Sequence, residues 1–362
     1  MSRLRTQPFA DLSVDHVAIY VNDIAASTEW LVSGYGMAVY ATAAPDDDTA
    51  TARSAGVGGN NIRLVLTEPL RGEHPGARYV EKHGDGVADI ALRVPDAAAA
   101  FEEAVRRGAR PLSEPAGHDG VVIATIAGFG DVAHSFVQRP DGASEQALPG
   151  LRPVAGAGAD PEIGLYEMDH FAVCVEAGQL DPTIAFYEQV LDFDMIFTER
   201  IIVGAQAMDS KVVQNASGSV TLTILEPDTS QSPGQIDEFL RNHNGAGIQH
   251  IAFATNDIVQ AVGAMTGNGV EFLATPDTYY TMLTERLELA RHSIADLRRL
   301  GLLADEDQDG QLFQIFAKSV HPRNTFFLEI IERVGARTFG SGNIKALYEA
   351  VELQRHKEEA RA

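Results

Sequence analysis

Two stretches of the sequence decide the fold: VDHVAIYVNDIAASTEWLV at residues 14–32 and MDHFAVCVEAGQLDPTIAFYEQVL at residues 168–191. Each opens with an Asp-His pair and alternates apolar with polar residues, which is typical of a β-strand with one buried face. Each then passes through a turn into apolar residues at helical spacing. The two stretches therefore predict the same strand–turn–helix unit twice.

The motifs that follow come in the same order in both halves. LVLTEP at 64–69 and GDGVADIALRVPD at 84–96 are matched by LTILEP at 222–227 and GAGIQHIAFATND at 245–257. Between the halves, PGLRPVAGAGADP at 149–161 is rich in Pro, Gly and Ala and has no periodicity, which is typical of a linker. The sequence therefore predicts a duplicated α+β unit, with a first domain at 12–147, a linker at 148–162 and a second domain at 163–362.

The second copy is longer than the first. It carries an insertion at 279–310, YYTMLTERLELARHSIADLRRLGLLADEDQDG, which predicts one or two helices ending in an acidic turn. After the last strand, NIKALYEAVELQRHKEEARA at 343–362 has an apolar helical stripe and a charged end, which predicts a packed terminal helix. Elaboration of one copy indicates that the two copies have different roles.

Composition excludes several classes of protein. With 45% hydrophobic and 22% charged residues among 362, the chain is globular rather than disordered or collagen-like. Its formal net charge of −23 repels phosphate backbones and anionic membrane surfaces. The first residues lack an apolar targeting segment, and the single cysteine, Cys174, lies in the apolar run FAVCV. We therefore expect a soluble cytoplasmic protein with a buried, inert thiol and no nucleic-acid or membrane partner.

Three residues of the second copy have side chains that suit a metal site. His170 opens the first strand, His250 opens the strand QHIAFAT, and Glu329 lies within TFFLEIIER. Their spacing is too long for a local zinc motif, but a curved sheet could bring them together. Two imidazoles and one carboxylate form the facial triad of non-haem Fe(II) oxygenases. Taken alone, a histidine at a strand start is more often a surface or capping residue, so the residues by themselves leave both interpretations open.

The neighbours of Glu329 favour the metal interpretation. Phe327 and Ile331, two positions away on either side, share its side of the strand, so the carboxylate faces inward and needs a partner, which a cation would supply.

The first copy has different residues at the three matching positions. They are His16, Asp89 and, by weaker matching, Ser135. This set lacks the second imidazole and the glutamate. We therefore expect the first copy to bind no metal.

A family resemblance follows from an ordered set of motifs. DHFAV, SKVV, GAGIQHIAFATNDI, EFLATPDTYY, GQLFQIFAK, FFLEIIER and TFGSGNIKALYEA span nearly all of residues 168–352. Together they resemble the 4-hydroxyphenylpyruvate dioxygenases and their sister enzymes, the 4-hydroxymandelate synthases. The first half matches more weakly, through the repeat and the string HGDGVADIA.

The resemblance implies a fold and a cofactor. The fold is two tandem vicinal oxygen chelate domains of paired β-α-β-β-β units, the C-terminal one an open barrel around the metal, with a C-terminal lid helix. The cofactor is Fe(II), held by His170, His250 and Glu329. The substrates are 4-hydroxyphenylpyruvate and O₂, and we expect a homodimer or a higher homo-oligomer.

The resemblance also implies a substrate pocket. Position-by-position matching places near the substrate or the iron Ser210, Thr223, Leu225, Gln235, Gln249, Gln314, Phe316, Phe327, Phe339, Asn343 and Ile344. The 2-oxo acid of the substrate can itself chelate iron, so no separate 2-oxoglutarate is expected, and no protein acid or base is assigned.

Departures from the family pattern bear on the product. Homogentisate-forming members typically have Pro-x-Asn-Glu-Pro where this chain has Thr223 to Pro227, and GFGxGNF where it has TFGSGNI. Leu225 thus replaces an amide and Ile344 replaces a ring, and both changes match the mandelate-forming branch. The sequence therefore favours 4-hydroxymandelate as product. The alternatives are homogentisate and, more remotely, a binding protein of the same fold without catalysis.

Overall fold

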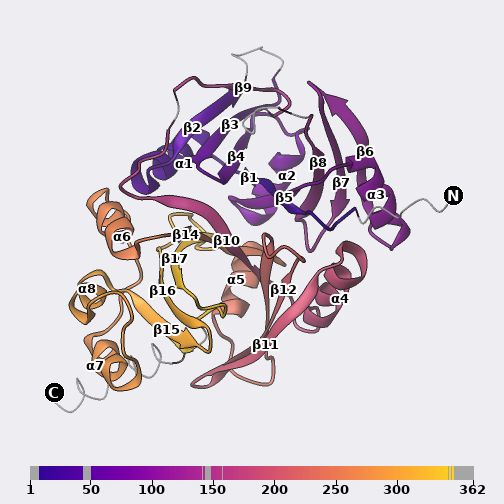
Figure 1. Cartoon of the computed structure of the whole chain (residues 1–362). Coiled ribbons are helices and arrows are strands. Elements are labelled where there is room, and N and C mark those ends of the chain that lie inside the picture. Colours follow the sequence, from indigo (N-terminus) through magenta and orange to yellow (C-terminus); the bar gives the residue numbers. More distant parts are fainter. Residues whose placement is uncertain are drawn as a thin grey trace.

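The structure, a computed structural model, describes residues 8–43, 50–140, 142, 148–156, 158–340, 342–343 and 345. It contains two curled sheets that lie side by side, one from each half of the chain (Figure 1). The first sheet has nine strands in the order β6-β7-β8-β5-β1-β4-β3-β2-β9, and the second has eight in the order β11-β12-β13-β10-β14-β17-β16-β15. The predicted α+β duplication is therefore confirmed.

The first unit comprises nine strands and the helices between them. The strands are β1 (Ser13–Tyr20), β2 (Ala38–Ala43), β3 (Ala52–Gly59), β4 (Ile62–Pro69), β5 (Gly86–Arg93), β6 (Pro111–His118), β7 (Val121–Ala127), β8 (Ala133–Gln138) and β9 (Leu151–Pro153). The helices are α1 (Ile24–Glu29), which runs on into the π-helical turn η1 (Trp30–Gly34), α2 (Pro75–His83) and α3 (Ala97–Arg106).

The second unit repeats this order with additions. Its strands are β10 (Leu165–Cys174), β11 (Asp194–Val203), β12 (Gln206–Gln214), β13 (Thr221–Pro227), β14 (Gly247–Thr255), β15 (Leu303–Asp307), β16 (Gly310–Phe316) and β17 (Phe327–Val334). Its helices are α4 (Leu180–Leu191), α5 (Gln235–His243), α6 (Ile258–Gly267), α7 (Asp277–Arg286) and α8 (Ile294–Leu300).

Matching residues play matching parts in the two units. β1 pairs in parallel with β4 and antiparallel with β5, as β10 does with β13 and β14. Asp96 and Asp257 cap the helices α3 and α6, accepting hydrogen bonds from the backbone N–H groups of Ala99 and Gln260. Such caps satisfy N–H groups that the first helical turn leaves unpaired, so the same motif starts the same helix twice.

Two features differ from the sequence predictions or extend them. The linker contributes β9, a short strand that pairs antiparallel with β2. The insertion forms most of α7, all of α8 and β15, and the turn that leads into β16, which confirms its helices and its acidic turn. The terminal helix predicted at 343–362 lies almost entirely outside the described residues.

The two units share one continuous hydrophobic core. Buried residues from both belong to a single cluster, and polar contacts cross the junction. Asn215 Nδ2 and Ser219 Oγ each donate to the carbonyl of Leu12 at 2.7 Å. Where α2 and α5 end, the rings of His83 and His243 stack with centroids 4.3 Å apart. The units therefore form one packed body.

Two smaller expectations concern the cysteine and membrane-spanning helices. Cys174 is fully buried, and burial raises the pKa of its thiol, as expected for an inert cysteine. Among the described residues, no helix is long and apolar enough to span a membrane.

Candidate metal centre and substrate cavity

The three metal-ligand candidates converge through strand register. β10 pairs antiparallel with β14, which places Ala172 opposite His250 and puts His170 two residues away on the same face. β14 pairs in parallel with β17, which places His250 opposite Phe327, two residues before Glu329. His170 Nε2 lies 3.3 Å and His250 Nε2 3.1 Å from the same oxygen, Glu329 Oε2. Residues far apart in the sequence thus form one buried cluster.

These separations fit a metal ion. Two neighbouring ligands of an octahedral ion with bonds of about 2.1 Å stand about 3 Å apart. His170 and Glu329 are 4% and 2% exposed, so both side chains are removed from solvent. A buried carboxylate approached by two imidazole nitrogens is a donor set that suits a divalent ion and leaves further coordination positions open.

The electrostatics favour an ionised carboxylate. Burial raises the pKa of Glu329, but the charge and hydrogen bond of His170, together with His250, outweigh burial and lower the pKa to about 2. Burial likewise lowers the pKa of His170, and the nearby carboxylates of Glu329 and Asp169 raise it to about 9. The carboxylate of Glu329 is therefore ionised, and a cation bound among the three side chains would take the place of the proton that His170 holds against it.

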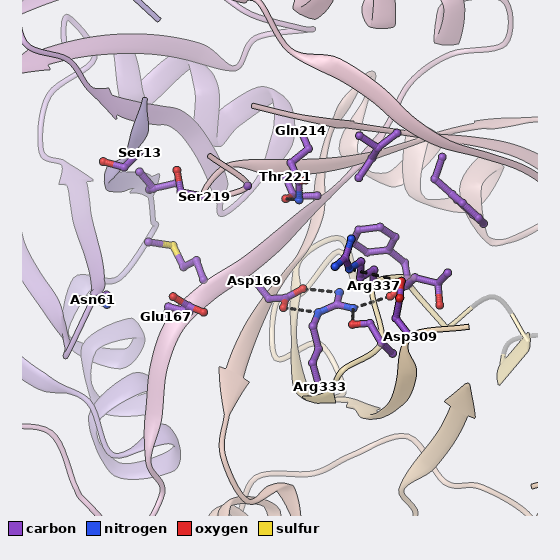
Figure 2. Close-up of a pocket in the computed structure, with 18 of the residues that line it drawn as sticks. Ser13, Asn61, Glu167, Asp169, Gln214, Ser219, Thr221, Asp309, Arg333 and Arg337 are labelled. Atoms are coloured by element: carbon purple, nitrogen blue, oxygen red, sulfur yellow. Dashed lines mark hydrogen bonds and ion pairs between the residues drawn. The ribbon is translucent and has the colours of Figure 1, made fainter. Parts of the chain in front are cut away.

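Each imidazole has an outer partner on its other nitrogen. His170 Nδ1 lies 2.8 Å from Asp169 Oδ1, and His250 Nδ1 lies 3.3 Å from Gln249 Oε1. Because an oxygen acceptor holds the proton on Nδ1, a metal would displace the proton on Nε2 and bind there. Asp169 is in turn held by Arg333 through two hydrogen bonds (Figure 2).

A small cavity of about 180 Å³ opens on the cluster. Its walls are largely apolar and aromatic, and rings surround the imidazoles. Phe327 stacks on His250 with centroids 5.0 Å apart, and Phe316 and Phe339 meet His250 and His170 edge to face. Most of the predicted pocket residues line this cavity together with the three candidate ligands: Ser210, Thr223, Leu225, Gln235, Gln249, Phe316, Phe327 and Phe339.

Three predicted pocket residues are not among those lining the cavity. Gln314 is buried beside Gly340, where its amide fills the space that a Cβ at Gly340 would need. Asn343 is buried, and its Oδ1 accepts a hydrogen bond from Tyr279 Oη at 2.8 Å. Ile344 lies outside the described residues. Gln314 and Asn343 therefore contact the segment after β17 and the insertion.

Two walls of the cavity are formed by residues that were not predicted from the sequence. Phe197, Glu199 and Ile201 line it from β11, alternating along the strand, and Leu273 and Leu303 line it from the insertion side. The alternation in DMIFTERIIV could have revealed the β11 wall. A register shift between Met195 and Phe197 obscures its phase.

The matching site in the first copy is closed by hydrogen bonds. Asp89 accepts from the backbone N–H of Ser135 at 2.9 Å and from its hydroxyl. Ser135 Oγ also lies 2.8 Å from Thr125 Oγ1. The β5–β8 register pairs Asp89 with Ala133, two residues before Ser135, just as His250 pairs with the residue two before Glu329. The positional match to Ser135, weak in the sequence, is therefore confirmed.

A second group of potential ligands has a structural role. Asp257, His292 and Glu332 have donor atoms close together. Glu332 Oε2 accepts from the backbone of Ile258 and faces His292 Nε2, both at 2.8 Å, and its Oε1 lies 2.6 Å from Arg291 Nη1. An arginine on the carboxylate repels a cation, so this group anchors the insertion to β17.

Comparison with known proteins identifies relatives for the whole chain. Residues 167–315 and 15–125 each match the Glyoxalase/Bleomycin resistance protein/Dioxygenase superfamily. The 4-hydroxyphenylpyruvate dioxygenase of Dictyostelium discoideum is 34% identical over 94% of this chain and 97% of its own length. The Caenorhabditis elegans enzyme of that name is 31% identical over 96% and 92%.

Solved structures also include proteins similar to this chain. A triple mutant of 4-hydroxymandelate synthase from Streptomyces coelicolor superposes with a TM-score of 0.85 at 40% identity, covering 96% of this chain and 99% of that chain. A TIM barrel/4-hydroxyphenylpyruvate dioxygenase fusion protein, 22% identical with a TM-score of 0.75 over 94% of this chain and 52% of its own, shares the fold. The chain belongs to the 4-hydroxyphenylpyruvate dioxygenase-like family, whose two tandem vicinal oxygen chelate domains it shares, and it is a dioxygenase of that family.

Proposed function

We propose that the chain is an Fe(II)-dependent dioxygenase that converts 4-hydroxyphenylpyruvate and O₂ to 4-hydroxymandelate and CO₂. One observation carries the proposal: the donor atoms of His170, His250 and Glu329 meet on the wall of a small aromatic cavity. Iron bound there would supply chelation of the 2-oxo acid and activation of O₂. The resemblance found in the sequence and the family of the relatives support the same cofactor and substrate.

The protein's own residues would bind and orient the substrate. Phe316, Phe327 and Phe339 offer flat apolar surfaces to an aromatic ring. Thr223 has a buried hydroxyl without a hydrogen-bond partner in the structure, so a polar group of the substrate would satisfy it. The apolar walls exclude water, which strengthens electrostatic interactions at the centre.

Mandelate is favoured over homogentisate by the wall of β13. Both products are isomers formed with one CO₂, so the choice depends on which carbon of the substrate is oxidised. Leu225 places an apolar side chain in the cavity where homogentisate-forming relatives typically have an asparagine. The 40% identity to a 4-hydroxymandelate synthase, against 34% for the Dictyostelium dioxygenase, supports the mandelate branch.

The second candidate is homogentisate formation. It is favoured by the names of the curated relatives, which are called 4-hydroxyphenylpyruvate dioxygenases.

Product analysis of the purified protein tests the proposal. We expect the Fe(II)-loaded protein, given 4-hydroxyphenylpyruvate labelled at the carboxyl carbon and no 2-oxoglutarate, to release the label as CO₂ and to yield chiefly 4-hydroxymandelate. Chiefly homogentisate would establish the second candidate. Label retained in the aromatic product, or no oxygen uptake with iron bound, would refute both.

A further inference from the structure

Arg333 lies near the end of β17, four residues after Glu329, and contacts three parts of the second domain. Its Nε donates to Asp169 Oδ2 at 2.7 Å and its Nη2 to Asp169 Oδ1 at 2.8 Å (Figure 2). The same Oδ1 faces His170 Nδ1 at 2.8 Å. A guanidinium binds a carboxylate with two parallel bonds in one plane, so Arg333 fixes the rotation of Asp169.

The same guanidinium also holds the segment that follows β17. Arg333 Nη1 donates to the carbonyl of Ala336 at 3.2 Å and to that of Thr338 at 2.6 Å. Its carbon Cζ lies 5.1 Å from the centre of the Phe339 ring, a cation–π contact. Asp307 reinforces this turn by accepting from the backbone N–H of Thr338 at 2.8 Å.

These contacts form a closed circuit of four side chains. Arg333 binds Asp169, Asp169 binds His170, and the His170 imidazole meets the Phe339 ring edge to face at 5.2 Å. Phe339 returns to Arg333 through the cation–π contact. Phe339 also lies between two cavities, since it lines both the small one at the metal cluster and one of about 960 Å³ between the two units.

We infer that Arg333 is a positioning residue that fixes a metal ligand, His170, and a pocket wall, Phe339, in one arrangement. This inference rests on the proposed Fe(II) function. Because Asp169 accepts the Nδ1 proton, the imidazole keeps its Nε2 directed at Glu329, and Arg333 keeps Asp169 from rotating away. The loss of Arg333 would therefore loosen the ligand and the ring together.

In the second copy, Arg333, Asp169 and His170 form a clamp in which an arginine holds the aspartate that precedes a histidine. The first copy contains the same clamp without the metal cluster. Arg139 Nε and Nη2 donate to Asp15 at 2.6 and 2.8 Å, and Asp15 Oδ1 lies 2.8 Å from His16 Nδ1. The side chains of Asp15 and Arg139 are each 1% exposed, against 11% for Asp169 and 22% for Arg333. The clamp is therefore a structural element common to both copies, and it has the positioning role only in the second copy, where a metal ligand and the Phe339 ring depend on it.

The two clamps provide a matched experiment on the full-length protein. The test variants are Arg333→Lys and Asp169→Asn, and the controls are Arg139→Lys and Asp15→Asn. For each, Fe(II) affinity is measured by anaerobic titration, Co(II) geometry by its visible absorption spectrum, and stability by urea unfolding. Lysine keeps the charge but not the bidentate fork, and asparagine keeps the size but not the charge.

We expect the test variants to weaken Fe(II) binding by about 10- to 100-fold and to alter the Co(II) spectrum. The controls should lower stability at least as much, because their pair is more buried, and should leave Fe(II) affinity and the Co(II) spectrum unchanged. Arg333→Lys should also change the ratio of products, because Phe339 is freed with the ligand.

Two results would overturn the inference. One is unchanged Fe(II) affinity and Co(II) spectrum in both test variants, and the other is an equal loss of affinity in the controls, which would mean that affinity follows general stability. Failure of the unmodified protein to bind Fe(II) would instead refute the proposed function, so the two failures are distinguishable.

Discussion

The two copies of the duplicated unit keep the same surroundings for the first histidine and differ in what faces it. His16 and His170 each follow an aspartate that an arginine holds through two hydrogen bonds. Facing them, the first copy has Asp89 and Ser135, and the second has His250 and Glu329 at the same register positions. The exchange of two residues thus distinguishes a site whose polar groups hydrogen-bond one another from a site able to hold a metal.

The difference shows how hydrogen bonds can make potential metal-ligating side chains unavailable to a cation. In the first copy the carboxylate of Asp89 is satisfied by Ser135, whose hydroxyl also bonds Thr125. In the second copy the carboxylate of Glu329 faces two imidazole nitrogens at distances that suit coordination. A side chain already satisfied by its neighbours would have to break those bonds to bind a cation.

The largest effect is expected from removing a ligand in the second copy. His250→Ala and Glu329→Ala should abolish turnover and weaken Fe(II) binding by more than about 100-fold. This loss exceeds the one expected on changing a residue that only hydrogen-bonds a metal ligand. His170→Ala should do the same. The measurements are oxygen uptake and anaerobic Fe(II) titration.

The matched change in the first copy is His16→Ala, which should keep full Fe(II) binding and turnover. Loss of iron on changing His16 alone would show that the first copy contributes to the metal site. Normal turnover in Glu329→Ala would refute the assignment of the metal site to the second copy.

The next effect concerns a histidine at the junction of the copies. Burial and the nearby charge of His83, then of Lys82 and Arg323, lower the pKa of His243 to about 4, and its Nδ1 donates to the carbonyl of Gly245. In the unfolded chain its pKa is about 6.5, so the unfolded state binds the proton more readily. Its contribution to stability is therefore complete above pH 6.5 and is lost as the pH falls towards 4, by up to about 3 kcal/mol.

The test is His243→Gln, which removes the titrating group. The difference in unfolding free energy between the variant and the unmodified protein should shift in favour of the variant as the pH falls from 7 to 5, by urea unfolding. His118→Gln, at an exposed position on β6, is the control. A difference that stays constant with pH for His243→Gln would contradict the prediction.

The repeat made most of the fold predictable from the sequence. Strand alternation and matched motifs indicated the duplicated unit, and the register of β1 and β10 confirms it. The pairing of β9 with β2 was not predictable, because a three-residue strand ending in Pro153 is too short to show a period. The π-helical turn after α1 likewise has no sequence signal distinct from that of an α-helix.

The metal cluster was predictable as a set, and parts of the pocket were not. His170, His250 and Glu329 were marked by motifs at strand positions, and the structure brings them together. Gln314 was expected on the wall from its match to the family, and it shares a face of β16 with Phe316. Alternation fixes the face of a strand but not the depth along it, and Gln314 lies beyond the cavity, against Gly340.

A third, smaller effect concerns the residue pair that we propose to shape the product. In the first copy Ser54 lies opposite Thr67 with their hydroxyls 2.9 Å apart, and in the second Ser210 lies opposite Leu225, which offers no hydrogen bond. Leu225→Asn should shift the product ratio towards homogentisate by about tenfold, a barrier change of about 1.4 kcal/mol. Chromatography of the products measures the ratio.

Leu225→Met keeps the volume and the apolar character and should leave the ratio unchanged. Ile344→Phe, at a position outside the described residues, should shift the ratio in the same direction as Leu225→Asn. If the unmodified protein makes mandelate and no variant changes the ratio, the pocket-wall argument fails and the family assignment is unaffected.

The smallest effect is expected where the first copy closes its own site. Ser135→Ala removes the hydroxyl that bonds Asp89 and leaves the backbone N–H bond of residue 135 in place. Asp89 is only partly buried, so the lost bond should lower the unfolding free energy by about 1 kcal/mol, measured in urea. Fe(II) affinity and turnover should not change, since Asp89 faces no second imidazole. A gain of tight Fe(II) binding at a second site in this variant would show that the hydroxyl alone keeps the first copy free of metal, and that the exchange at position 89 matters less than the comparison implies.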